Sequence, residues 1–236
     1  VQKLTLLDFP GHVACTVFLN GCNFCCPFCY NSSLINENPT NTILENDFFS
    51  FLKSRQGILD GVAITGGEPL LQKGIKEFII KIRALGYKVK LDTNGSFPDV
   101  LQELIEEQLV DYVAMDIKNS WNKYDLTSGA HYLKEVKKSI SILLSNKVDY
   151  EFRTTVVKQL HSKEDFEIIG QMIQGASNYF IQCFQPNENV IDKKGFIIKD
   201  GEQIIDFTTS VFKQMKSTDI IYNIYRVPES MIMRPD

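Results

Sequence analysis

The sequence lacks the features that would direct it to a membrane, out of the cell or to nucleic acid. No apolar run approaches the ~20 residues that a membrane-spanning helix needs. The N-terminal residues show no basic stretch followed by an apolar one, so no secretory signal is visible. Lysine and arginine number 25 against 29 aspartates and glutamates, and this net charge of −4 gives no argument for a nucleic-acid or phospholipid surface. We therefore expect a cytoplasmic protein that binds neither membranes nor nucleic acid.

Internal repeats, low-complexity tracts and linkers are also lacking. The chain has 236 residues, of which 44% are hydrophobic and 23% charged, and these values are ordinary for a globular protein. A barrel-type α/β fold of this length need not be divided, so we expect one domain over residues 1–236. Without export, the six cysteines are expected to be thiols or metal ligands rather than disulfides.

Short apolar runs alternate with amphipathic stretches along the chain. Runs rich in β-branched and aromatic residues predict strands at 13–19, 62–65, 87–92, 112–117, 150–157, 179–184 and 220–225. Helical spacing of apolar residues predicts helices at 47–54, 71–85, 98–107, 133–145, 163–174 and around 202–216. Strands that are each followed by a helix predict a mostly parallel sheet, either doubly wound or closed in part or in full as a β/α barrel.

Glycines and polar residues follow the predicted strands at their carboxyl ends. TGGEP follows the second strand, LDTNG ends the third, MDIK ends the fourth, an arginine lies within the fifth, and IQCFQPN ends the sixth. Functional loops of parallel α/β proteins follow the carboxyl ends of the strands. We therefore expect a single site on that face of the sheet.

Four of the six cysteines lie within eight positions, in GCNFCCPFCYN at residues 21–31. Two spacings are available, because Cys22, Cys26 and Cys29 form C-x3-C-x2-C while Cys22, Cys25 and Cys29 form C-x2-C-x3-C. Three thiolates can ligate a cubane iron–sulfur cluster and leave the fourth iron open for catalysis. A zinc site would use all four cysteines, but such sites usually combine two separated pairs, and no second pair exists here. The pattern therefore favours the cluster over zinc.

Together these motifs resemble the radical S-adenosylmethionine (SAM) superfamily. The C-x3-C-x-aromatic-C spacing followed by GGEP carries that resemblance. QKLTLLDFPG, VFLNGCNFCCPFCYN, AITGGEPLLQ, KLDTNG and MDIK further resemble the glycyl-radical-enzyme activases, closest to those that activate anaerobic ribonucleotide reductase. The resemblance covers residues 2–187. It implies a partial β/α barrel of about six parallel strands, with the cluster at its carboxyl-terminal mouth and a lateral opening for a partner protein.

The resemblance implies a [4Fe-4S] cluster held by Cys22, Cys26 and Cys29. Cys25 would then be spare, a departure from relatives that usually carry another residue there. Neighbouring side chains of an extended loop point in opposite directions, so Cys25 should face away if Cys26 faces the cluster. Cys15 and Cys183 lie within predicted strands and are expected in the core.

The resemblance also implies a SAM site at the strand ends. The backbone of Gly66 and Gly67, together with Glu68, would receive the methionine amino group, since glycine lets the backbone approach closely. Asp92 and Thr93 would help to hold a monovalent cation near the cofactor's carboxylate. The alternative for GGEP is an ordinary strand-to-helix turn with proline at the first helical position, and for Asp92 a turn or a cap.

The aromatic residue before the third cysteine is implied to bind adenine. Phe28 would pack on the ring, and the backbone from Phe28 through Cys29 to Tyr30 would bond its edge. Tyr30 stands where relatives commonly have histidine, which changes little if only its backbone is used.

Further cofactor contacts are implied after the fourth, fifth and sixth strands. Asp116, Ile117 and Lys118 match the D-x-K of the activases and would contact the ribose and carboxylate side of SAM, although Asp116 could instead form a turn or cap. Arg153 would pair with the carboxylate or form an internal salt bridge. Gln185 lies where some activases have a ribose-binding histidine.

His161 is the one histidine whose position suggests a catalytic base. It precedes a helix for which Ser162 is the expected N-cap and Asp165 completes a capping box. We expect a surface or loop histidine, because the implied reaction needs no general base.

The implied reaction is reductive cleavage of SAM to a 5′-deoxyadenosyl radical, which installs a glycyl radical on a partner enzyme. Anaerobic ribonucleotide reductase is the expected partner, and a flavodoxin- or ferredoxin-type protein is the expected electron donor. Two alternatives remain open: a radical SAM enzyme that acts on a small molecule or peptide, and a non-catalytic electron-transfer or metal-binding module.

Overall fold

The computed structural model describes residues 1–35, 42–184 and 221–225. The predicted helix around 202–216 and Gln185 lie outside these residues, as do the side chains of Cys183 and of the last strand. That residues 1–236 form one domain stays a prediction. The described strands are β1 Gln2–Thr5, β2 Ala14–Leu19, β3 Gly61–Gly66, β4 Lys88–Thr93, β5 Tyr112–Asp116, β6 Asp149–Val156, β7 Asn178–Cys183 and β8 Ile221–Tyr225.

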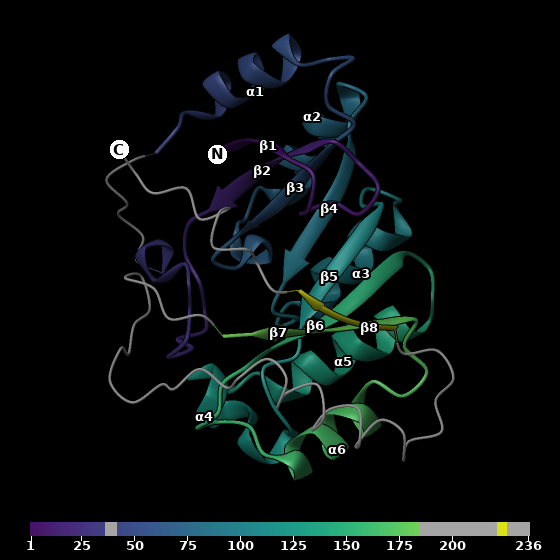
Figure 1. The fold of residues 1–236 in the computed structure, drawn as a ribbon. Helices are drawn as coiled ribbons and strands as arrows, with labels where there is room; N and C mark the ends of the chain where they lie inside the picture. The colour runs from purple at the N-terminus through teal and green to yellow at the C-terminus, as the bar shows by residue number, and fades with distance from the viewer. Residues whose placement is uncertain (36–41, 185–220, 226–236) are drawn as a thin grey trace.

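These strands form one curved sheet in the order in which they follow along the chain (Figure 1). β2 to β8 are parallel neighbours, and β1 pairs antiparallel with β2. Within the described residues β1 and β8 are the two edges, so the sheet stays open. The predicted partial parallel barrel is confirmed, with β8 as a seventh parallel strand. β1 was not predicted, because its four residues are mostly exposed and form no apolar run.

The helices follow the strands much as predicted. They are α1 Glu45–Ser54, α2 Ile75–Ala84, α3 Pro98–Glu106, α4 Tyr124–Ser128, α5 Leu133–Leu144 and α6 Lys163–Met172, with 3₁₀ turns η1 Ser32–Leu34, η2 Pro69–Leu71 and η3 Trp121–Lys123. α2 begins four residues later than predicted, because η2 comes first. Gly86, two residues after the last residue of α2, has a positive φ of 88°, the conformation in which glycine commonly ends a helix. No helix among the described residues has both the length and the apolar character needed to cross a membrane.

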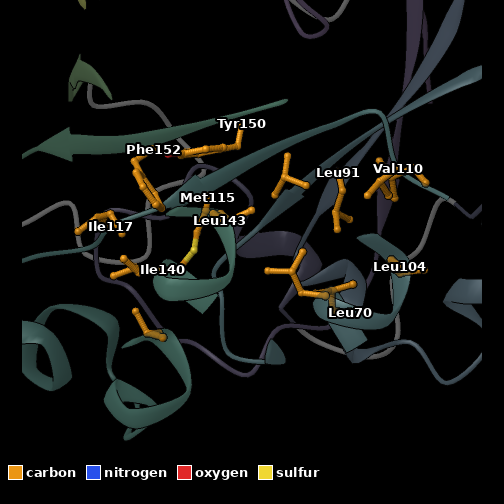
Figure 2. Close-up of a cluster of buried hydrophobic side chains, with 14 of the residues drawn as sticks. Leu70, Leu91, Leu104, Val110, Met115, Ile117, Ile140, Leu143, Tyr150 and Phe152 are labelled. Carbon is orange, nitrogen blue, oxygen red and sulfur yellow. The ribbon is translucent and has the colours of Figure 1, made fainter. Parts of the chain in front are cut away.

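The core lies between the sheet and its helices, and Figure 2 shows part of it. Strand residues such as Leu91 and Phe152 are completely buried, as are Leu104 of α3 and Leu143 of α5. Each such side chain contributes about 1.5–3 kcal/mol relative to an exposed position. This packing fixes the sheet and therefore the positions of the loops at its carboxyl edge.

The loop after β3 presses against the end of β2. The Gly67 N–H donates to Leu19 O at 2.8 Å, and the Glu68 N–H donates to Gly21 O at 2.8 Å. A Cβ atom on Gly67 would lie 2.0 Å from Gly21 O, and one on Gly66, whose φ is +119°, would lie 2.3 Å from Leu19 O. Both positions therefore require glycine to let the two loops meet.

We predict that Gly67→Ala destabilises the cofactor-free protein by about 3 kcal/mol, because backbone must move to admit the methyl group. Gly74→Ala is the matched control, since a Cβ there meets nothing within 4 Å; it should cost less than about 1 kcal/mol. Urea unfolding of the three proteins measures the difference. Equal losses at both positions would show that the close contact between the loops is not required.

Candidate functional site

The cysteine loop after β2 is anchored on the end of α4. The Cys25 N–H donates to Ser128 O at 2.9 Å, and Cys26 Sγ lies 3.7 Å from the same oxygen. Gly129 follows with a φ of +67°, and a Cβ there would lie 2.8 Å from Cys25 O. The Cys29 N–H donates back to Cys26 O at 3.1 Å, so the loop turns tightly between its second and third predicted ligands.

The cysteines of this loop differ in exposure. Cys26 is buried, Cys22 and Cys29 are half-buried, and Cys25 is exposed; all four are free thiols. Adjacent Cys25 and Cys26 thus have opposite environments, as expected for neighbours in an extended loop. Cys15 is completely buried within β2, which confirms its predicted place in the core.

Burial disfavours thiolates at this loop. It raises the pKa of Cys26 to about 12, an effect that Lys118 opposes and that the nearby Cys29 and Cys22 reinforce. Burial also raises the pKa of Cys22 and of Cys29, and Lys118 lowers both. Three thiolates here would need more positive charge than Lys118 supplies, and iron ions supply such charge. Ligation of a cluster would therefore have to displace protons from these thiols.

A single metal ion is a poorer match to these thiols. Among the described residues, no three His, Cys, Asp or Glu side chains converge on one ion position. The zinc alternative gains no support from this arrangement. In a cubane cluster each thiolate binds a different iron, so the three sulfurs need not converge on one point.

Glu68 of the GGEP motif is completely buried and fully used by the protein. Its Oε1 accepts from the Leu70 N–H at 3.1 Å and from the Thr93 hydroxyl at 2.8 Å, and its Oε2 accepts from the Asn94 N–H at 2.7 Å. Burial raises the pKa of Glu68 to about 7, although these hydrogen bonds oppose the shift. The carboxylate ties the loop after β3 to the loop after β4. Thr93, a predicted cation ligand, points its hydroxyl hydrogen at Glu68 instead.

Asparagine side chains tie the cysteine loop to its neighbours, a role that the sequence did not reveal. Asn31 Nδ2 donates to Gly66 O at 3.1 Å. Asn94 Nδ2 donates to Asn23 Oδ1 at 3.0 Å, and Asn23 Nδ2 donates to Ser96 Oγ at 2.8 Å. These asparagines lie directly beside the cysteine and LDTNG motifs, and that proximity was the only signal in the sequence.

A row of charges crosses the inner face of β4, β5 and β6. Arg153 Nη1 lies 3.3 Å from Asp92 Oδ2, and Arg153 Nε donates to Asp116 Oδ1 at 3.0 Å. Lys118 Nζ donates to the other oxygen of Asp116 at 2.9 Å. Burial alone would raise the pKa of Asp116, but Lys118 and Arg153 hold it well below its usual range. Of the two alternatives for Arg153, the internal salt bridge is present, and neither aspartate caps a helix.

The predicted adenine-binding residues pack against the end of β7. Phe28 is buried, and its ring meets that of Phe184 edge-on with centroids 6.5 Å apart. The Tyr30 ring stacks on Phe184 at 5.7 Å, so this side chain has a packing role besides its backbone. Ile117 is completely buried and donates its N–H to Arg153 O at 2.7 Å. Phe184 was not singled out in the sequence, where a lone phenylalanine at a strand end looks like core.

His161 lies in the loop before α6, as expected of a loop histidine, but its side chain is only 3% exposed, so the alternative of a surface position is wrong. Its Nε2 lies 2.9 Å from Lys118 O, and the Val157 N–H donates to Nδ1 at 3.1 Å. Nδ1 also lies 3.2 Å from Val157 O, so each ring nitrogen has a backbone carbonyl within hydrogen-bond distance. Burial lowers the pKa of His161, in keeping with a neutral ring. The His161 side chain fixes the backbone at Lys118. The sequence could not reveal this role, because the partners of His161 are backbone atoms.

The predicted capping box of α6 is confirmed. Ser162 and Asp165 exchange the two side-chain-to-backbone bonds of that motif. Asp165 also accepts from Ser120 Oγ at 2.7 Å and from Lys123 Nζ at 2.5 Å. The box therefore holds the segment after Lys118 against α6.

A cavity of about 1140 Å³ lies on the inner side of the sheet. Asp92 and Arg153 line it, so it borders the charged row at the predicted cofactor site. Leu4, Leu6 and Leu7 line it near the free edge of β1, and all three are largely exposed. The cavity thus combines charged walls with an apolar rim.

We predict that Asp165→Asn lowers the free energy of unfolding near neutral pH and removes part of its decrease at acid pH. Burial alone would raise its pKa, but bonds from Lys123, Ser120 and Ser162 lower the pKa of Asp165 from 3.8 to about 2. This stability is complete above pH ~4 and is lost as the pH falls towards 2, about 2 kcal/mol in all. Urea unfolding of the cofactor-free proteins at pH 7 and pH 3 measures it. Asp99→Asn, at an exposed ion pair, is the control; equal pH dependence in wild type and Asp165→Asn would contradict the assignment.

The fold is similar to that of solved structures in which SAM is present. The chain superposes on Streptococcus suis SuiB bound to S-adenosylmethionine with a TM-score of 0.68 and 15% sequence identity. The match covers 89% of this chain and 49% of SuiB. At this identity the likeness establishes the fold.

Sequence comparison relates the chain to curated enzymes. A Methanocaldococcus jannaschii protein named "putative glycyl-radical enzyme activating enzyme" is 35% identical over 196 residues, which are 80% of each chain. The pyruvate formate-lyase-activating enzyme of Listeria monocytogenes is 28% identical over 63% of this chain and 69% of its own. The GTP 3′,8-cyclase of Helicobacter pylori is 29% identical over 83% of this chain and 62% of its own.

The family profile of the Radical SAM superfamily matches residues 16–171, which run from the strand before the cysteine loop into α6. The match therefore contains the cysteine loop, GGEP, LDTNG, MDIK and Arg153. The chain belongs to the radical SAM superfamily, whose enzymes use a [4Fe-4S] cluster and S-adenosylmethionine.

Proposed function

We propose that this enzyme installs a glycyl radical on a partner protein, and that the partner is an anaerobic ribonucleotide reductase. The observation that carries the proposal is the 35% identity to the M. jannaschii protein named as a glycyl-radical enzyme activating enzyme, over 80% of both chains. The full set of motifs from the N-terminal LTLLDFPG to MDIK supports the activase branch.

Cys22, Cys26 and Cys29 are the proposed cluster ligands. The burial of Cys26 and the exposure of Cys25 support this choice over the alternative spacing. Cys26 Sγ lies 3.7 Å from Ser128 O, which also accepts from the Cys25 N–H, and these contacts hold the Cys26 side chain on the inner side of the loop.

The strand ends are the proposed SAM site. The backbone of Gly66 and Gly67 with Glu68 receives the methionine amino group. A nearby ammonium would favour the charged form of Glu68, whose pKa burial raises to about 7. Asp116 and Lys118 face the ribose and carboxylate side. When bound, SAM and the cluster supply the hydrogen-abstracting radical chemistry, and the protein supplies position and exclusion of water.

The adenine side of the proposed site is aromatic. Phe28 and Tyr30 form one packed unit with Phe184, and the chain from Phe28 through Cys29 to Tyr30 connects this unit to the third cluster ligand. Ile117 is buried and holds the intervening strand end to β6. These contacts support a position for adenine beside the cysteine loop.

A protein substrate suits the open side of the sheet. β1 and β8 leave the described sheet unclosed, and the 1140 Å³ cavity borders the proposed cofactor site. The exposed Leu4, Leu6 and Leu7 line the other end of this cavity, beside the first residues of the strands, because Thr5 pairs with Ala14 at the start of β2. A glycine-bearing loop of a partner could therefore reach the cofactor from the side.

A small-molecule substrate is the second candidate, because GTP 3′,8-cyclases match the chain at similar identity to the pyruvate formate-lyase-activating enzyme. The M. jannaschii relative named as an activating enzyme matches at a higher identity, 35% against 29% for the H. pylori cyclase, and this favours the activase.

We predict that Cys26→Ala abolishes both iron binding and 5′-deoxyadenosine formation after anaerobic reconstitution, because a buried cluster ligand is lost. Cys25→Ala is the matched control at the adjacent position and should retain most of both, since its side chain is exposed. Iron content and product yield with SAM and dithionite measure the two. Equal losses in both variants would reverse the choice of spacing.

We predict that the reduced enzyme, SAM and an anaerobic ribonucleotide reductase of the same organism yield a glycyl doublet by electron paramagnetic resonance. A flavodoxin- or ferredoxin-type donor should replace dithionite. A reductase variant with alanine at the radical glycine is the control and should show no doublet. If 5′-deoxyadenosine forms but no glycyl radical protein of that organism gains the doublet, the activase proposal is wrong; turnover of GTP would then support the second candidate.

A further inference from the structure

The charged row leaves little room for the monovalent cation that the resemblance implies. Both oxygens of Asp92 are already paired, Oδ1 with Lys90 Nζ and Oδ2 with Arg153 Nη1. Both oxygens of Asp116 are paired as well, Oδ1 with Arg153 Nε and Oδ2 with Lys118 Nζ. The carboxylates expected beside that cation therefore carry side-chain cations instead.

The other expected cation ligand is also engaged. Thr93 uses its hydroxyl hydrogen on Glu68 Oε1 at 2.8 Å, and its oxygen accepts from the Gly95 N–H at 3.1 Å. No group of three acidic, histidine or cysteine side chains among the described residues is placed to hold a metal ion. The two carboxylates expected beside the implied ion are therefore already balanced by side-chain cations.

The ion pairs of Asp92 with Lys90 and of Asp116 with Arg153 follow from the positions of these residues on their strands. Lys90 and Asp92 are two residues apart on β4, so their side chains lie on the same face of the sheet. Asp116 is the register partner of Arg153 on the adjoining strand, which brings the guanidinium to the same face. The pairing follows from strand register rather than from the arrangement of a flexible loop.

Lysine is unusual at a buried strand position such as residue 90 unless its charge has a role. It is only 2% exposed, and a buried ammonium is costly without a paired carboxylate. Arg153, Lys118 and Lys90 balance Asp92, Asp116 and the nearby Glu151, whose Oε1 lies 3.9 Å from Arg153 Nη1. This set of six is neutral without any added ion.

We propose that the ammonium of Lys90 takes the place of the monovalent cation, so that this enzyme binds SAM without one. Lys90 is then a positioning residue: it neutralises and orients Asp92, which borders the cofactor site. An alkali cation at Asp92 would have to displace the ammonium or lie beside it, and the two like charges would repel each other. The inference rests on the use of SAM and not on the identity of the partner.

The first test is the ion dependence of the wild-type enzyme. We expect the Kd for SAM, measured by equilibrium binding to the reconstituted protein, to change less than about twofold when tetramethylammonium replaces K⁺ or Na⁺ at constant ionic strength. A loss of fivefold or more in tetramethylammonium would overturn the proposal. This measurement uses only the wild-type enzyme, so it tests the proposal even if variants of Lys90 fail to fold.

The second test removes the ammonium. Lys90→Met should weaken SAM binding about tenfold in tetramethylammonium, since Asp92 loses a buried partner, and K⁺ or Na⁺ should restore most of it. The melting temperature of the cofactor-free variant should rise with K⁺ in parallel. Lys88→Met, on the same strand and exposed, is the matched control and should show neither effect. If Lys90→Met weakens SAM binding and no alkali cation restores it, Lys90 acts only through packing and the proposal is wrong. If SAM binding is unchanged in Lys90→Met, Lys90 has no role in it and the proposal is also wrong.

Discussion

The carboxylate of Glu68 is the interaction on which the assembly of this site depends. It is completely buried, and it accepts hydrogen bonds from Thr93 and Asn94 of the loop after β4. The Glu68 N–H reaches Gly21 O of the cysteine loop, so one residue connects the loops after β2, β3 and β4. A buried carboxylate without such partners would cost several kcal/mol, so these loops cannot separate cheaply. The bonds of Asn31 and Asn94 strengthen the same junction.

A second set of interactions continues the site across β4, β5 and β6, and here ion pairs replace hydrogen bonds. Arg153 lies between Asp92 and Asp116, while Lys90 and Lys118 pair with the outer oxygens. Two like charges 4 Å apart at an effective dielectric constant of 20 repel by about 4 kcal/mol. A cation placed beside Lys90, Arg153 or Lys118 would meet this repulsion, and the carboxylates that could offset it are already paired with side-chain cations.

The sequence predicted what local patterns determine. β2 to β8 are apolar runs of β-branched and aromatic residues, and the glycines, carboxylates and thiols at their carboxyl ends identified the site. It could not predict β1, which is short and exposed, or α4, which has five residues. Side chains whose partners are distant in sequence were also missed: Lys90 was unremarked, and His161 was expected at the surface although it bonds Lys118 O. Arg153 was left between two roles because strand register, not sequence spacing, brings it to Asp116.

The central claim is that the cysteine loop holds a cluster with one iron open to SAM, beside strand ends that position the cofactor. Electron paramagnetic resonance of the reconstituted, dithionite-reduced protein during a titration with SAM tests it most directly. The account predicts that the signal of the reduced [4Fe-4S] cluster changes in line shape and that the change saturates with SAM. A spectrum that stays the same at saturating SAM would contradict it, because the fourth iron would then be closed or distant from the cofactor.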